Sequence, residues 1–451
     1  MIRSDFPLNH FKPMKTTRRN FLKSTSVATI AAPFILPSHI WAADVKPNDR
    51  INMGFIGMGK QNQYLLRHFM NLKGTQAVAV CDVDKTRRKD ARKRVENHYA
   101  DKTQAGYFTG CEDYLDYQKL LERDDIDAVC IATPDHWHAL MATDAAKAKK
   151  DIYCEKPLCQ SIKEGRRMVN AVRSNKRIFQ TGSMQRSSEE FRVACELVRN
   201  GIIGPISRVE VSVGGPAKAC DLPEEAMEPG LDWGRWLGPA AKRPYNSALS
   251  PRGVHNHYPA WRNYREYGGG GVTDWGAHHF DIAQWGLGMD NEGPRRIYPS
   301  KDPESGQGVR MVYQNGIEML HTNGNGVTFF GKDGKVNVNR GQFKFWMGDK
   351  QVAGNREQCK QVEQEYLADA KVRLYKSTDH KNDFLDCMRT RTRPIADVEI
   401  GARTVTVCHL VNLAYYHNQP MVWNPFREQF INGKGEKAWL DVEHRAPYSF
   451  G

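Results

Sequence analysis

Beyond residue 47 the sequence alternates between short apolar runs and longer segments in which apolar and charged residues are mixed. The apolar runs have the length of buried strands and lie at residues 51–56, 75–81, 128–132, 151–154 and 178–182. Helical patterns occupy the stretches between them, at residues 62–70, 84–98, 114–123, 136–149 and 161–174. Repeated strand–helix units imply a parallel sheet with right-handed crossovers, so we predict a doubly wound α/β domain over residues 48–183.

The second part of the chain, residues 184–451, has a different pattern. Residues 206–213 alternate apolar and polar side chains as an antiparallel strand does. Further strand-like runs lie at 309–313, 317–320, 327–331 and 336–338, and helical patterns lie at 274–287, 380–389 and 400–417. Residues 340–376 are polar, and we interpret them as an irregular insertion in this second domain.

Between the first strand and the first helix the sequence reads Gly57-Met-Gly59-Lys60-Gln61-Asn62. Two glycines here allow a tight turn and bring the backbone close to a pyrophosphate at the helix N-terminus. These residues are therefore candidates for binding a dinucleotide, which would make the parallel sheet a Rossmann domain. The alternative is a structural turn in another α/β fold. Asn62 departs from the pattern, because glycine or alanine is usual at that position.

The second strand ends in Asp82. An acid at this point binds the adenosine ribose hydroxyls and disfavours a 2′-phosphate, so Asp82 indicates NAD rather than NADP. Arg87 and Arg88 follow closely and could accommodate a 2′-phosphate, which keeps NADP open as the alternative.

The fourth strand is followed by Glu155-Lys156-Pro157. Open parallel sheets bind their ligands at the carboxyl ends of the strands, so Lys156 is placed to bind a substrate hydroxyl beside a nicotinamide ring. The alternative is a surface lysine that pairs with Glu155.

A glycine run, residues 268–271, precedes Asp274 and His278. Residues four apart lie on one face of a helix, so these two side chains are a candidate set for proton transfer near Lys156. The glycines would let the backbone approach a ligand; a capping aspartate and a packed histidine are the alternative. We expect the neighbouring His279 to point away from the site and Trp275 and Trp285 to lie in the core.

Aromatic and polar side chains suit a sugar, which offers an apolar ring face and hydroxyl groups. Candidates for contacting substrate lie ahead of the glycine run and just past the last strand of the first domain: His255, Tyr258, Trp261, Arg262, Gln185 and Arg186.

Taken in order over about residues 50–420, these motifs resemble those of the glucose–fructose oxidoreductase, inositol dehydrogenase and rhizopine-catabolism (Gfo/Idh/MocA) family. The matching elements are the glycine turn, Cys81-Asp82, residues 133–138 (TPDHWH), Glu155-Lys156-Pro157 and the pair Asp274 and His278. The resemblance implies a Rossmann domain followed by a C-terminal α/β domain with an open, mostly antiparallel sheet. Because that sheet commonly forms subunit contacts in the family, a homo-oligomer, dimer or tetramer, is expected.

The same resemblance assigns roles by position. It implies that Lys156, Asp274 and His278 are catalytic and that Asp281 is structural. It also implies four neighbours of the cofactor, namely Thr133, Pro134, His138 and Glu155. Either Lys156 or His278 could be the base, and the sequence leaves that choice open.

The N-terminus has the layout of an export signal. Arg18 and Arg19 are followed by Phe21-Leu22-Lys23 and by an apolar segment, residues 24–37. We therefore predict a twin-arginine signal peptide over residues 1–43, export of the folded protein by the twin-arginine machinery, and a periplasmic location.

Composition excludes several other classes. The net charge of +13 includes about +5 from residues 1–43, and the remaining basic residues are scattered, so nucleic-acid binding is not expected. No apolar run is long enough to span a bilayer. We expect the ten cysteines to be free thiols, and their spacing with histidines matches no metal site.

An exported enzyme would have to keep its nicotinamide cofactor, because free cofactor is scarce outside the cytoplasm. We therefore expect an NAD(P)-dependent oxidoreductase that acts on a hydroxyl of a sugar, glycoside or cyclitol with a tightly bound cofactor. Two alternatives remain: an NAD-dependent enzyme that cleaves glycosides through transient oxidation of the sugar, and a non-catalytic carbohydrate-binding protein.

Overall fold

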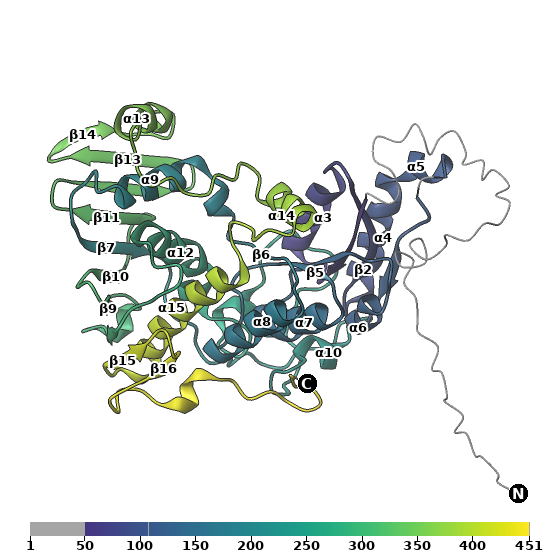
Figure 1. Cartoon of the computed structure of the whole chain (residues 1–451). Helices are drawn as coiled ribbons and strands as arrows, with labels where there is room; N and C mark the ends of the chain where they lie inside the picture. Colours follow the sequence, from purple (N-terminus) through teal and green to yellow (C-terminus); the bar gives the residue numbers. More distant parts are fainter. Residues whose placement is uncertain (1–49, 107, 451) are drawn as a thin grey trace, which may run out of the picture. The chain divides into compact units, whose positions relative to one another are not determined.

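A six-stranded parallel sheet forms the first part of the fold, as the alternating pattern predicts (Figure 1). The structure is a computed structural model, and it describes residues 50–106 and 108–450. Within those residues the strands pair in the order β3-β2-β1-β4-β5-β6, with bounds Ile51–Ile56 (β1), Thr75–Cys81 (β2), Glu112–Tyr114 (β3), Ala128–Ile131 (β4), Asp151–Cys154 (β5) and Phe179–Thr181 (β6). The predicted signal peptide lies outside the described residues.

Helices connect these strands, and several begin at residues whose side chains cap them. The Asp84 side chain accepts from two N–H groups at the start of one helix, and Ser161 and Glu164 form a capping box at the start of another. The helices are Lys60–Met70 (α3), Lys85–His98 (α4), Ala100–Gln104 (α5), Tyr117–Leu121 (α6), Asp135–Lys147 (α7) and Ile162–Ser174 (α8).

The helix expected over 114–123 is shorter than predicted. Residues Glu112–Tyr114 form the edge strand β3, and α6 begins only after Asp116, whose side chain caps it. A three-residue edge strand is too short to give a periodic signal in the sequence.

A second, mixed sheet follows, and most of its strand pairs are antiparallel. Its ten strands within the described residues pair in the order β14-β13-β12-β11-β7-β10-β9-β8-β15-β16, and only β7 and β10 run parallel. The bounds are Ile206–Ser212 (β7), Arg296–Tyr298 (β8), Arg310–Val312 (β9), Glu318–Thr322 (β10), Val327–Gly331 (β11), Gly334–Asn339 (β12), Gln342–Met347 (β13), Lys350–Ala353 (β14), Met421–Asn424 (β15) and Gln429–Phe430 (β16). The structure thus confirms the expected α/β fold class of this second part, with its mostly antiparallel sheet.

Helices α9 and α12 pack against strands β7, β11 and β12 of this sheet (Figure 1). The sequence did not predict α9, although its acidic first turn is typical of a helix start. The helices of this part are Glu189–Arg199 (α9), Trp233–Leu237 (α10), Gly270–Asp274 (α11), Gly276–Leu287 (α12), Cys359–Tyr366 (α13), His380–Thr390 (α14) and Val398–His417 (α15). Single-turn helices lie at Met184–Ser187 (η2), Ala260–Asn263 (η3), Pro303–Ser305 (η4) and Lys437–Leu440 (η5).

The expectation of an irregular segment at 340–376 was wrong. This segment contains β13, β14 and α13, and the two strands extend the second sheet to its outer edge. Phe343 and Phe345 of β13 are fully buried and alternate with Gln342 and Lys344, so the apolar–polar pattern of a strand is present, but over only four residues. Whether the segment is an insertion stays a prediction.

The late chain returns to the Rossmann sheet and completes its core. Phe384 of α14 packs at a T-shaped angle against Phe69 of α3, with 6.4 Å between ring centroids, and Figure 1 shows these two helices side by side. The described residues, 50–106 and 108–450, belong to one compact unit, so the expected boundary between 183 and 184 stays a prediction.

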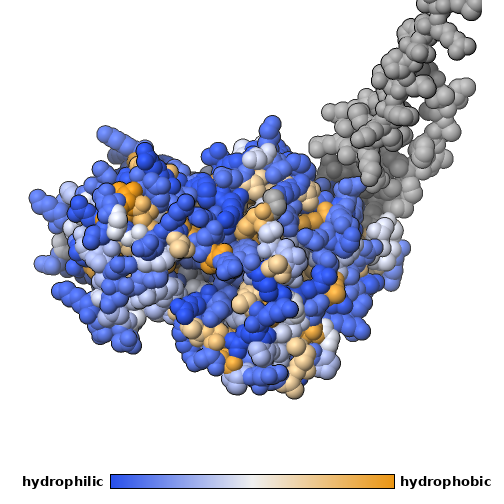
Figure 2. Space-filling view, turned by 90° about the horizontal axis from the view of Figure 1, so that it is seen from below, coloured by the Kyte–Doolittle hydropathy of each residue, from blue (hydrophilic) through white to orange (hydrophobic). Residues whose placement is uncertain are grey.

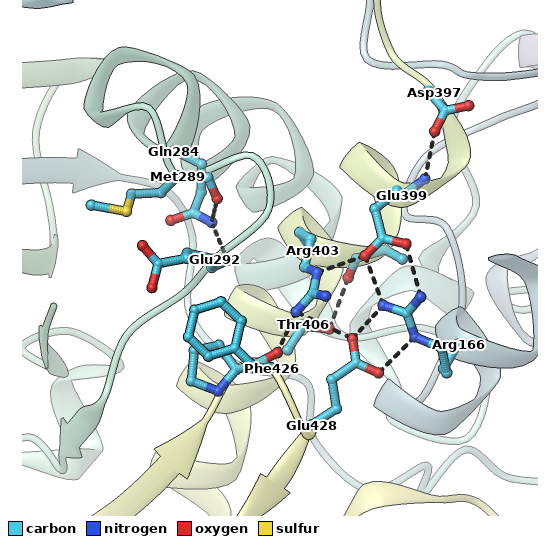
Figure 3. A network of polar contacts seen from close by, with 12 residues as sticks. Arg166, Gln284, Met289, Glu292, Asp397, Glu399, Arg403, Thr406, Phe426 and Glu428 are labelled. Carbon is cyan, nitrogen blue, oxygen red and sulfur yellow. Dashed lines mark hydrogen bonds and ion pairs between the residues drawn. The ribbon is translucent and has the colours of Figure 1, made fainter. Parts of the chain in front are cut away.

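A half-buried charge network joins α8 to α15 and to the turn between β15 and β16 (Figure 3). Arg166 of α8 donates to both carboxylate oxygens of Glu399 at 2.7 and 2.8 Å and to both of Glu428 at the same distances. Burial alone would raise the pKa of Glu399, but Arg166 and Arg403 outweigh it and lower that pKa to about 2. The network therefore fixes α8 against α15 and the β15–β16 turn.

On the face in Figure 2, hydrophobic residues lie in small separate groups among hydrophilic ones. Among the described residues, no helix is both long and apolar enough to cross a bilayer.

All ten cysteines lie in the described part of the chain and are free thiols.

Candidate active site

The glycine turn lies where β1 meets α3, at one wall of a cavity that we call the nucleotide cavity. Gly57 has a φ of +83°, and a Cβ there would lie 2.7 Å from the Thr133 side chain, so the position requires glycine. Gly59 precedes α3, and a Cβ there would meet nothing within 4 Å. Lys60 and Gln61 also line the cavity, so the first turn of α3 offers free N–H groups to an anion.

Asn62 does not line the nucleotide cavity. Its side chain is fully buried, and its Nδ2 donates to the carbonyl of Ile56 at 3.1 Å and to that of Cys130 at 3.4 Å. Hydrogen bonds from Asn62 therefore hold α3 on the sheet, where a glycine or alanine would instead allow close packing.

Asp82 lies at the carboxyl end of β2 and lines the cavity. Its carboxylate accepts from the backbone N–H of Met58 at 2.6 Å and of Asp84 at 2.8 Å, and burial raises its pKa. Arg88 is paired with Asp113 at 3.2 Å and does not line the cavity. The Arg87 guanidinium donates to the carbonyl of Gly253 at 3.0 Å and to Ser250. Both arginines are thus already engaged, which favours NAD over NADP.

Residues 249–262, here called the strap, cross from the second part of the fold over the nucleotide cavity. The Tyr258 hydroxyl donates to Oε1 of Gln61 at 3.1 Å, and the Lys60 ammonium lies 4.5 Å from the Tyr258 ring centroid. Arg87 also donates to the strap, at Gly253 and Ser250, so residues of the Rossmann part hold this segment at two points beside the cavity.

A second cavity, here called the catalytic cavity, adjoins the first, and both are lined by Gln61, Thr133 and Tyr258. Lys156, Asp274 and His278 all line it, so the structure brings the three predicted catalytic residues together. Lys156 leaves the end of β5, and its Nζ donates to Oδ1 of Asp274 at 2.6 Å and to the Asp274 carbonyl at 2.9 Å.

The helix that carries Asp274 and His278 differs from the prediction. It begins earlier, at Gly270, and is interrupted at Trp275, so that Asp274 ends α11 and His278 lies in α12. The glycine run approaches the chain's own backbone instead of a ligand, since a Cβ on Gly270 would lie 2.4 Å from the amide nitrogen of Ala217. Its role is close packing beneath the site.

Burial and charge set the protonation of these groups. Burial lowers the pKa of His278 well below its usual range, and the charges of Lys156 and Arg340 act in the same direction. The Nδ1 atom of His278 is buried without a hydrogen-bond partner. Burial would raise the pKa of Asp274, but the charges of Lys156 and Arg262 outweigh it and lower that pKa. The site thus holds a neutral imidazole beside an ion pair.

The loop after β4 contributes Thr133 and Pro134, which line the nucleotide cavity as the resemblance implies. His138 does not line either cavity, because its ring is buried between the carbonyls of Pro157 at 2.8 Å and Thr133 at 3.0 Å. It joins the two loops that carry Thr133 and Lys156. Glu155 is buried, lines the catalytic cavity and accepts from Gln61 at 2.9 Å.

Three predicted substrate contacts lie elsewhere. Arg186 is 1% exposed and is bound to Asp281 at 2.8 Å and to Asp290, so both Arg186 and Asp281 are structural. His255 lines the nucleotide cavity, and burial lowers its pKa to about 4. Gln185 is buried behind His278 and lines neither cavity. Tyr258, Trp261 and Arg262 do line the catalytic cavity.

The sequence missed several residues of the catalytic cavity, among them Asp135, Trp275 and Arg340. Asp135 is 4% exposed, and burial raises its pKa well above the usual range. Trp275 was expected in the core but is 43% exposed at the cavity, whereas Trp285 is buried as expected. Arg340 lies in the segment interpreted as an insertion, so no local signal marked it.

Comparison with known proteins agrees with this geometry. Residues 51–183 match the sequence model described as "Oxidoreductase family, NAD-binding Rossmann fold", and residues 216–450 match its "C-terminal alpha/beta domain". The chain therefore belongs to the Gfo/Idh/MocA oxidoreductase family, and its first domain is an NAD-binding Rossmann domain.

Two solved structures share the fold at low sequence identity. The WlbA dehydrogenase from Bordetella pertussis, in complex with NADH and UDP-GlcNAcA, is 15% identical, with a TM-score of 0.57 over 84% of this chain and 99% of that one. The aldose-aldose oxidoreductase from Caulobacter crescentus, in complex with glycerol, is 16% identical, with a TM-score of 0.56 over 83% and 99%.

Among curated proteins, a glycosyl hydrolase family 109 protein from Shewanella putrefaciens is 30% identical over 212 residues, which are 43% of this chain and 45% of the relative. The chain spans less than half the length of the curated relatives it matches.

The residues present fit an NAD dinucleotide. Gly57 and Gly59 leave room for a pyrophosphate at α3, Asp82 presents a carboxylate to a ribose, and Thr133 lies where the two cavities meet. A dinucleotide bound along this path would bring its nicotinamide to Lys156 and His278.

Proposed function

We propose that this protein transfers hydride between a hydroxyl of a sugar, glycoside or cyclitol and a tightly bound NAD. One observation carries the proposal: Lys156, Asp274 and His278 line a single cavity that opens into the nucleotide cavity of a Rossmann domain. The printed names of the structural relatives, an aldose-aldose oxidoreductase and a dehydrogenase complexed with a nucleotide sugar, support a carbohydrate substrate.

The residues of the chain divide the proton chemistry among them. His278 is neutral because of its lowered pKa, so its imidazole can accept the proton of the sugar hydroxyl. Lys156 is held by Asp274 and has a further N–H to donate to the oxygen that loses this proton. The bound nicotinamide supplies a hydride acceptor for the carbinol hydrogen, which leaves a ketone.

Retention of the cofactor is part of the proposal. Release of a dinucleotide past the strap would break the contacts that Tyr258 makes with Gln61 and Lys60 and those of Arg87 with the strap. Such a cofactor would be reoxidised in place by a second substrate. This suits the proposed export through the twin-arginine route to the periplasm, where free NAD is scarce.

Glycoside cleavage through transient oxidation is the second candidate. The curated relatives carry the name glycosyl hydrolase family 109, which favours it. It would use the same cavity, since both reactions begin with removal of a hydroxyl proton and a hydride.

Products separate the two functions. The protein with bound NAD is incubated with a panel of free sugars and aryl glycosides, and NADH absorbance, keto-sugar and released aglycone are measured. Keto-sugar with reduced cofactor supports the oxidoreductase, and aglycone with unchanged cofactor supports cleavage. Absence of all three across the panel contradicts both.

A further inference from the structure

The turn between β12 and β13 places one arginine at the catalytic cavity. Arg340 and Gly341 form this two-residue turn, and Gly341 has a φ of +68°, a conformation that glycine adopts without strain. The N–H of Gly341 donates to Oε1 of Glu190 at 3.2 Å, and Arg356 donates to the other oxygen of that carboxylate. The turn is thus fixed to α9, which gives Arg340 a defined position.

Two further residues orient the Arg340 side chain. Its guanidinium lies 4.7 Å from the ring centroid of Trp275. With the Gln185 amide oriented to satisfy both of its groups, its nitrogen donates to the His278 carbonyl at 3.1 Å and its oxygen accepts from Nε of Arg340 at 3.2 Å. Gln185, a predicted substrate contact, therefore supports Arg340 from behind.

Among the residues that the structure describes, the Arg340 guanidinium forms no ion pair, although the charges of Glu155 and Asp274 act on it from a distance. Lys156 is paired with Asp274, and Arg262 shares the same carboxylate at 3.8 Å. Glu155 is held by Gln61. Among the described residues, Gln185 accepts from Nε of Arg340 and no hydrogen bond uses its two terminal nitrogens, which remain for a ligand in the catalytic cavity.

We propose that Arg340 binds a carboxylate of the substrate, so that the protein acts on uronic acids or their glycosides. The inference rests on the proposed function and narrows its substrate class. A guanidinium that lies beside an indole ring, with both terminal nitrogens free, matches the two oxygens of a planar carboxylate. The reacting hydroxyl of the same sugar would then lie deeper, at Lys156 and His278.

The test measures binding and turnover separately. Isothermal calorimetry on the NAD-loaded protein compares D-glucuronate and D-galacturonate with glucose, galactose and glucose 6-phosphate. Turnover is compared for the methyl glycosides of the same sugars. Arg340→Gln removes the guanidinium, and Arg296→Gln, an exposed arginine on β8 outside both cavities, is the matched control.

We expect the wild type to bind one uronate at least about 10-fold more tightly than its neutral parent. Arg340→Gln should weaken that binding by about 10- to 100-fold and change binding of the neutral sugar less than about 3-fold, and the control should match the wild type.

Three results would overturn the inference. One is that no uronate is preferred over its parent, and another is that Arg340→Gln affects charged and neutral sugars equally. The third is a stronger preference for glucose 6-phosphate, which would make the anion a phosphate. Uronate binding that depends on Arg340 without any turnover would support the site while contradicting the proposed hydride transfer.

Discussion

Replacing His278 by asparagine tests the assigned base. Asparagine keeps a polar side chain of similar length but cannot accept a proton at neutral pH. The imidazole is 5% exposed, its Nδ1 makes no hydrogen bond, and it lines the catalytic cavity, so few other contacts are lost. A fall in rate would therefore report on proton transfer.

The expected loss follows from general base catalysis, which contributes about 10²- to 10⁴-fold, or about 2.7 to 5.5 kcal/mol of activation free energy. The pH dependence gives a second signature. Since the pKa of His278 is lowered, the imidazole remains an available base below the ordinary histidine value of about 6.5. In the pH profile of the wild type, the fall in rate on the acid side (the acid limb) should therefore lie below that pH. The variant should not show this fall.

Single-turnover reduction of bound NAD, followed by absorbance in a stopped-flow instrument between pH 5 and 9, measures both quantities. His279→Asn is the matched control, because His279 is equally buried but hydrogen-bonds the Ser212 carbonyl and does not line the cavity. A His278→Asn rate within 3-fold of wild type, or an unchanged acid limb in that variant, would refute the assignment.

Four further predictions follow from the same structure. Lys156→Ala should slow hydride transfer by at least about 10²-fold with NAD still bound, which nucleotide analysis of the purified variant would check. Asp82→Asn should weaken NAD binding by about 10-fold without weakening NADP binding, measured by fluorescence titration, because only the ribose hydroxyls need the carboxylate. Burial lowers the pKa of His321 to about 4. Between that pH and about 6.5, the unfolded chain therefore binds a proton that the folded chain does not. The free energy of unfolding should thus fall as the pH drops through 6.5. Relative to His321→Gln, the wild type should therefore lose about 1.4 kcal/mol of unfolding free energy by pH 5.5, measured by urea titration at pH 7.5 and 5.5. Arg166→Met should destabilise the fold by about 2 kcal/mol in the same assay, because it leaves Glu399 and Glu428 short of a partner; an unchanged midpoint would contradict the role of that network.

Much of the Rossmann sheet could be predicted from the sequence because its strands are buried on both faces. The residues of β2 and β4 are all buried, so each is a continuous apolar run. The edge strand β3 is partly exposed and has only three residues, so it forms no comparable apolar run. The outer strands of the second sheet alternate instead, and in β13 the alternation that buries Phe343 and Phe345 covers too few residues to stand out.

The site was predictable where a residue type and its position at a strand end agree, as for Lys156 and Asp82. The site was not predictable where packing between distant segments of the chain determines the position of a residue. Arg186 was chosen for its charge and position, yet two carboxylates from α12 and the loop after it bury it. Arg340 and Trp275 reach the cavity only because the β12–β13 turn folds against α12, a contact between segments about 65 residues apart in sequence.

The most direct measurement of the central claim is the nucleotide content of the purified protein after denaturation. The account predicts about one NAD or NADH per chain, reduced when a substrate sugar is added before denaturation. Protein that carries no nucleotide and takes up added NAD only weakly would contradict a retained cofactor, and with it the proposed chemistry in the periplasm.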